Sequence, residues 1–177
     1  ADPGVYAQGL EGKHRPGHFA GVREIVSRLF EFVGPCRAYF GEKDYQQLQI
    51  IYQLAQTMLG IDVIGCPTSR ESSGLARSSR NQRLDPAGLQ QAGAIYEAMQ
   101  AANQRWNQGE HLPCVLQGAM LEVLDQTGIK LEYAEVRDPD HWTREQPQQR
   151  IEQARILIAA EIDGVRLIDN MALGSTG

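Results

Sequence analysis

The chain has 177 residues, a net charge of −5 and 42% hydrophobic residues, a composition typical of a folded globular protein. Its mild acidity argues against nucleic-acid binding, which normally needs a basic surface. No apolar run approaches the roughly 18 residues that cross a membrane. The three cysteines are far apart and lack a CxxC spacing, which argues against a disulfide framework or structural zinc and favours a reducing, cytoplasmic setting.

The first part of the sequence predicts alternating helices and strands. Apolar residues from Val22 to Val33 recur at the spacing of a helical stripe, and the short apolar run 36–40 predicts a strand. A second helical stripe spans 48–59, with Gly60 as a C-cap, and 61–65 predicts another strand. Helix, strand, helix and strand with short joints are typical of an α/β unit with a parallel sheet.

The joint "GEKD", Gly41 to Asp44, lies between the first predicted strand and the following helix. Ligands of open α/β sheets bind at the carboxyl ends of strands, and unpaired amides at a helix N-terminus attract anions, which Lys43 would reinforce. A structural alternative stays open, in which Asp44 and Gln47, which have the spacing of a capping box, cap the helix and Gly41 simply turns the chain.

The segment from Pro67 to Pro86 predicts a long loop, because it is rich in Ser, Arg, Gly and Pro and has no apolar periodicity. Long loops within domains are often functional lids. Four arginines in it have the chemistry for bidentate phosphate contacts: Arg70, Arg77, Arg80 and Arg83. A solvated linker between domains is the alternative.

The second part of the sequence predicts two helices followed by an antiparallel sheet. Asp85-Pro86 begins a long helix, and a second helix spans about 112–127 before Gly128. Asp163-Gly164 is a two-residue hairpin signal. The predicted strands are 129–133, 154–162 and 165–170. These elements indicate a small α+β domain.

Four motifs together resemble one enzyme family: "LEGKHRPGHFAGV" at Leu10, "FGEKDYQQL" at Phe40, "GLARSSRN" at Gly74 and "RLIDN" at Arg166. Their order and spacing are similar to those of the pantothenate synthetases, the pantoate:β-alanine ligases of coenzyme A biosynthesis, from about Gly9 to Leu173. The resemblance implies an α/β fold. Residues 1–85 would be the C-terminal part of a Rossmann-like nucleotidyltransferase domain, and 86–177 a small α+β lid domain.

The resemblance also implies the reaction. Members of this family condense pantoate with β-alanine by using ATP and Mg²⁺, through a pantoyl adenylate, and release pyrophosphate and AMP. It further implies a cytoplasmic enzyme that forms a homodimer in its full-length form, and some members of the family are fused to a cytidylate kinase.

By the resemblance, the "GEKD" joint belongs to the ATP site. Gly41 and Glu42 would line it, Lys43 would contact the phosphates as a catalytic residue, and Asp44 would lie near the ribose. Gln47 would contact pantoate. No metal ligand from the protein is implied.

The loop also gains a nucleotide-binding role from the resemblance. Arg77 to Arg80 aligns with a mobile segment in which Ser78, Ser79 and Arg80 would hold phosphates and act in catalysis. Ser69 matches a position that contacts adenine mainly through its backbone. Arg77 replaces a usually apolar residue, and both altered packing near adenine and an added phosphate contact stay open.

The family's N-terminal region with the HxGH nucleotide motif has no counterpart in the sequence. "HRPGH", His14 to His18, is one residue too long for that motif, and with Glu11 and Arg15 we expect His18 to shape the helix entry and pocket wall. The chain is therefore expected to be a C-terminal portion that is inactive alone. The alternatives are another nucleotidyltransferase of the same superfamily and a non-catalytic assembly module.

Overall fold

The computed structural model describes residues 3–174, so the outer ends of the two predicted domains lie outside the described residues. Contacts divide the chain into two compact units, which are described separately. The first comprises the residues up to Thr68 together with Thr143–Glu145, and the second comprises Ser69–Trp142 and the residues from Gln146 onward.

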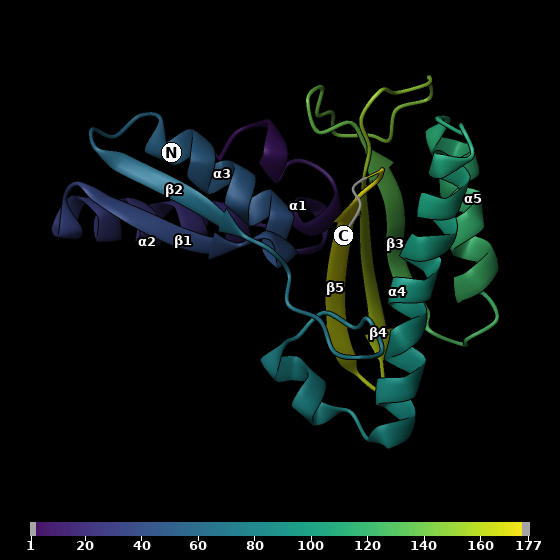
Figure 1. Cartoon of the computed structure of the whole chain (residues 1–177). Helices are drawn as coiled ribbons and strands as arrows, with labels where there is room; N and C mark the ends of the chain where they lie inside the picture. The colour runs from purple at the N-terminus through teal and green to yellow at the C-terminus, as the bar shows by residue number, and fades with distance from the viewer. Residues whose placement is uncertain (1–2, 175–177) are drawn as a thin grey trace. The chain divides into compact units, whose positions relative to one another are not determined.

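The first unit is built around a pair of parallel strands (Figure 1). Strand β1 aligns with β2 in parallel register, from Cys36 beside Ile61 to Gly41 beside Cys66, which confirms the predicted parallel sheet. The elements are η1 (Val5–Ala7), α1 (Leu10–His14), α2 (His18–Val33), β1 (Cys36–Gly41), η2 (Glu42–Asp44), α3 (Tyr45–Ala55) and β2 (Ile61–Cys66).

Helices α2 and α3 form the core of the first unit with alternate residues of β1. Phe30 of α2 packs with Leu48 and Ile51 of α3, and Ala38 of β1 packs against this cluster. The apolar stripe predicted for α2 is buried only in part, because Ile25, Leu29 and Val33 are exposed. Phe32 is 89% exposed. The helix therefore has a second apolar face that the described residues leave open to solvent.

Helix α3 ends at Ala55, earlier than the periodicity predicts. The amides of Thr57 and Met58 bond to carbonyls three residues back, which is the geometry of a tightened last turn. Gly60 closes the connection with a φ of +76°, and a Cβ there would lie 2.8 Å from the Cβ of Pro35. The apolar periodicity of the sequence continues past the end of the helix because Met58 still packs against the core.

The second unit is a three-stranded antiparallel sheet in the order β3-β4-β5, with α4 and α5 side by side on one face (Figure 1). Asp163 and Gly164, with φ of +51° and +75°, form the predicted hairpin turn between β4 and β5. The elements are η3 (Ser79–Arg83), α4 (Pro86–Asn107), α5 (Pro113–Leu124), β3 (Lys130–Arg137), β4 (Arg155–Ile162) and β5 (Val165–Ala172).

Residues 69–85, in the loop between β2 and α4, belong to the second unit by their contacts. The domain boundary predicted from the sequence assigned them to the first domain. Leu75 and Leu84 of this loop are buried in the same apolar cluster as Ile95 and Ile158. Burial of two leucines against α4 and the sheet fixes the loop to this unit. None of the helices in the described part of the chain is long and apolar enough to cross a membrane.

Candidate functional site

The first part of the candidate site is the carboxyl end of β1, where the strand ends at Gly41 and η2 leads into α3. Gly41 has an extended backbone, with φ of −71° and ψ of +135°, that any residue adopts. A Cβ at Gly41 would meet no heavy atom within 4 Å. Neither chain reversal nor packing therefore requires glycine here, and the space beside Gly41 suits the close approach of a bound group.

The capping box predicted as an alternative is not formed. Asp44 occupies the N-cap position of α3, but its side chain makes no capping hydrogen bond. For the Gln47 side chain, which is half-buried, the structure shows no hydrogen bond to any described residue. Asp44 and Gln47 are thus not explained by capping the start of the helix.

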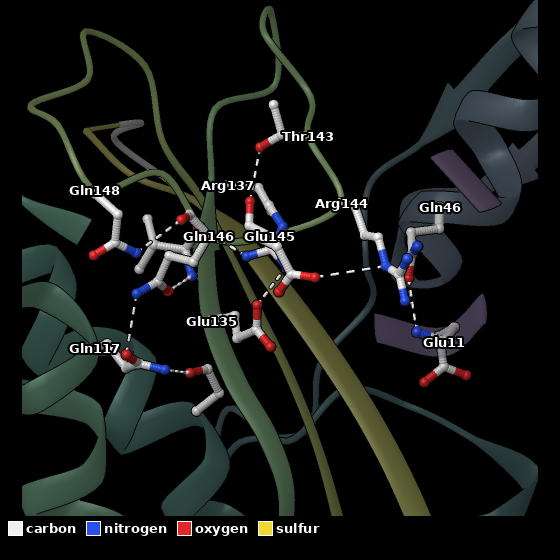
Figure 2. Close-up of polar contacts among 12 residues, drawn as sticks. Glu11, Gln46, Gln117, Glu135, Arg137, Thr143, Arg144, Glu145, Gln146 and Gln148 are labelled. Atoms are coloured by element: carbon white, nitrogen blue, oxygen red, sulfur yellow. Dashed lines mark hydrogen bonds and ion pairs between the residues drawn. The ribbon is translucent and has the colours of Figure 1, made fainter. Parts of the chain in front are cut away.

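Gln46, beside Gln47, has a structural role (Figure 2). Its side chain is buried, and its Nε2 donates to the carbonyl of Tyr6 at 2.7 Å. The backbone N–H of Glu11 donates to its Oε1 at 3.0 Å. These bonds attach the N-terminal turns to α3, a role that the sequence pattern did not reveal.

His18, at the start of α2, interacts electrostatically with Asp44 of this corner. Burial lowers the pKa of its imidazole below 6.5, and the charge of Arg15 lowers it further, while Glu11 and Asp44 act in the opposite direction. The influence of Asp44 indicates that the "HRPGH" segment and the "GEKD" joint share one neighbourhood. Within the residues described, no group of three or more His, Cys, Asp or Glu side chains is arranged to hold a metal ion.

The second part of the candidate site is the segment Ser69 to Arg80, which forms a small hairpin in the second unit. Arg70 bridges Ala76 in antiparallel fashion, and the amide of Arg77 donates to the carbonyl of Ser69 at 2.9 Å. Ser78 caps η3, because its Oγ accepts from the amide of Arg80 at 3.2 Å. The predicted phosphate-binding residues are thus presented on an ordered turn, with Ser79 exposed.

The arginines of this segment differ in what they contact. Arg77 pairs with Glu71 at 3.3 Å, and both side chains are exposed, so the pair contributes little to stability. Arg70 instead directs its guanidinium at the carboxylate of Asp169, at 2.6 and 3.1 Å. Its donors are used within the chain, so Arg70 is not a free phosphate clamp. A partner 99 positions away leaves no local signal in the sequence.

The comparisons with known proteins agree with these motifs. The family model for pantoate-beta-alanine ligase matches residues 2–172. The chain belongs to this family. Pantothenate synthetase of Christiangramia forsetii is 43% identical over 169 residues, covering 94% of this chain and 59% of the relative. That of Paracoccus denitrificans is 46% identical over 166 residues, covering 93% and 57%.

Solved structures of the ligase family share the fold. Pantothenate synthetase from Thermus thermophilus has a TM-score of 0.87 at 36% identity, covering 97% of this chain and 61% of the other. The ligase from Francisella tularensis, solved in complex with β,γ-ATP and β-alanine, has a TM-score of 0.69 at 35% identity, covering 97% and 56%. The chain therefore spans between 56% and 61% of the length of these four proteins.

Proposed function

We propose that the chain supplies part of the ATP site, the pantoate contact and the lid of a pantoate:β-alanine ligase. The carboxyl end of β1 carries this proposal. Neither the backbone conformation nor packing requires a glycine at position 41, and Asp44 makes no capping hydrogen bond. Nucleotide binding explains this combination, because an open site beside a helix N-terminus suits phosphate.

The chemistry proceeds in two steps. A carboxylate oxygen of pantoate attacks the α-phosphorus of ATP, forming pantoyl adenylate and releasing pyrophosphate. The amine of β-alanine then attacks the acyl carbon and loses a proton, and AMP leaves with the electrons of the broken acyl–oxygen bond. Adenylation is needed because a free carboxylate is a poor acyl donor.

Cationic and hydroxyl groups of this chain would offset the charge that develops on the phosphates. Lys43 is proposed for this role at the end of β1, and Ser78, Ser79 and Arg80 on the hairpin. Mg²⁺ would arrive as part of the substrate, MgATP. In the same proposal, Glu42 lines the nucleotide site.

The remaining assignments concern recognition. Asp44 is proposed to contact the ribose, Gln47 to contact pantoate, and Ser69 to contact adenine through its backbone. The contrast with Gln46, whose amide nitrogen and oxygen each make a hydrogen bond, supports the choice of Gln47. Arg77 is also proposed to lie at the nucleotide site, and its guanidinium pairs with Glu71 at the exposed surface.

We propose that the chain alone is inactive, because catalysis needs every group of the site in place at once. The fraction of its relatives that it spans supports this proposal. We also propose a cytoplasmic location, a homodimer in the full-length form and fusion to a cytidylate kinase. All three cysteines are free, which is compatible with a reducing compartment.

Isotope exchange between pyrophosphate and ATP tests the proposed adenylate. The protein would be the chain extended by the rest of the length found in its relatives. We expect exchange that requires pantoate and proceeds without β-alanine. Exchange that is indifferent to pantoate would favour another nucleotidyltransferase, and a folded extended protein without exchange would favour an assembly module.

A further inference from the structure

A partly buried ion pair joins the hairpin that carries Ser78 to Arg80 to strand β5. We propose that Arg70, paired with Asp169, is a positioning residue that holds this hairpin in the shape that contacts ATP. The link to ATP rests on the proposed function, whereas the attachment itself rests on the geometry of the second unit.

The guanidinium of Arg70 is surrounded by acceptors. Its Nη1 donates to Oδ2 of Asp169 at 2.6 Å and to the carbonyl of Gly74 at 2.9 Å. Its Nη2 donates to Oδ1 of Asp169 at 3.1 Å and to the carbonyl of Asn170 at 3.2 Å. The guanidinium carbon also lies 4.9 Å from the ring centroid of Tyr96, within cation–π range.

The position of Asp169 is fixed by strand pairing and by a backbone hydrogen bond. It lies in β5, opposite Ile158 of the central strand β4, and its side chain is 2% exposed. Its Oδ1 also accepts the backbone N–H of Asn170 at 2.7 Å. Because the carboxylate is buried, loss of the guanidinium would remove the bidentate cationic partner of a buried charge, so the pair is favoured to stay closed.

Arg70 also contacts the backbone of the hairpin at the carbonyl of Gly74, and this contact and the ion pair with Asp169 are together called the anchor. The amide of Glu71 donates to the carbonyl of Leu75 at 2.8 Å, and Gly74 completes the turn with a φ of +84°. A Cβ at Gly74 would lie 2.0 Å from a ring carbon of Tyr96, so only glycine lets the turn approach this ring. At the far end, Nδ2 of Asn81 donates to the carbonyl of Ala76 at 3.1 Å.

Arg70 therefore joins three parts of the unit: the turn at Gly74, the ring of Tyr96 on α4, and β5. The residues proposed to hold phosphate begin directly after this anchored backbone. Donors aimed at a phosphate are effective only when their position is fixed beforehand, so a looser hairpin would bind ATP less well. A lysine at position 70 keeps the charge but cannot form the bidentate fork.

The test has two arms and three variants: Arg70→Lys, Asp169→Asn and Tyr96→Leu. In the first arm, amide hydrogen exchange is measured on the chain itself, and we expect exchange at Glu71, Gly74 and Arg77 to accelerate about tenfold or more in the first two variants. Tyr96→Leu leaves the ion pair intact and should give a smaller change, which keeps the test usable if a charged variant unfolds. Arg105→Lys on the exposed surface of α4 is the matched control.

In the second arm, steady-state kinetics are measured on the extended protein. We expect the KM for ATP to rise about tenfold in Arg70→Lys, with the KM for β-alanine unchanged. Unchanged exchange in the hairpin would overturn the anchor. Faster exchange with unaltered kinetics would overturn positioning and leave a structural role. If the unsubstituted extended protein does not use ATP, the proposed function and the link to ATP both fail, and the exchange arm still decides the anchor.

Discussion

Adjacent glutamines of α3 are expected to respond differently to the same substitution. Gln46→Ala removes one buried and one partly buried hydrogen bond, including the acceptor of the Glu11 amide, so we expect the free energy of unfolding to fall by about 1–3 kcal/mol. Gln47→Ala should leave stability nearly unchanged and raise the KM for pantoate more than that for ATP. Urea unfolding and steady-state kinetics measure both effects. Equal weakening of both substrates by Gln47→Ala would contradict the pantoate contact.

Lys43 is expected to act on phosphate rather than on the fold. Lys43→Ala in the extended protein should slow adenylation by about two to three orders of magnitude, because a fixed cation no longer offsets the phosphate charge. The free energy of unfolding should change little, since half-exposed charges contribute weakly. Lys13→Ala, on the exposed surface of α1, is the control. Normal turnover by a folded Lys43→Ala protein would rule out the phosphate contact.

The imidazole of His18 is expected to titrate below its ordinary value of 6.5, because burial and Arg15 disfavour its charged form. The unfolded chain then binds the proton more readily, so the contribution of His18 to stability decreases as the pH falls below about 6.5. NMR titration measures the pKa directly. We expect Arg15→Gln to raise this pKa and Asp44→Asn to lower it further, and shifts of opposite sign would refute the charge arrangement.

At the scale of elements, α4 and α3 begin differently. The Oδ1 of Asp85 accepts the amide of Gly88 at 2.8 Å, whereas Asp44 makes no capping bond. Asp85→Ala should therefore lower the free energy of unfolding by about 1 kcal/mol, and Asp44→Ala by much less. Chemical denaturation compares the two variants. A similar loss in both would restore the capping-box interpretation at α3.

Elements with strong local signals could be predicted from the sequence. Asp85-Pro86 at the start of α4 and Asp163-Gly164 between β4 and β5 were predicted correctly, because caps and tight turns depend on neighbouring residues. The candidate binding position at Gly41 was predicted from a general rule, because ligands of open parallel sheets bind at the carboxyl ends of the strands.

Features that depend on distant partners could not be predicted in this way. The ion pair of Arg70 with Asp169 joins positions far apart in the chain, so Arg70 looked like any other loop arginine. Gln46 and Gln47 are identical in type, and Gln46 is distinguished by its hydrogen bonds to Tyr6 and Glu11, which are distant in the sequence. The exposed apolar face of α2 also escaped prediction, because periodicity shows that a residue is apolar and not what covers it.

At the scale of the whole molecule, each compact unit carries some of the residues proposed to bind ATP. The residues Gly41 to Gln47 belong to the first unit, and Ser69 to Arg80 belong to the second. The chain also spans little more than half the length of its pantothenate synthetase relatives.

The decisive measurement is ATP-dependent pantothenate formation, with AMP release followed in parallel, on the chain alone and on its extended form. We expect the extended protein to form pantothenate and AMP in equal amounts, and only when pantoate and β-alanine are both present. The chain alone should form neither. A folded extended protein that makes no pantothenate would contradict the ligase assignment, and full activity of the chain alone would contradict its proposed dependence on the remaining length.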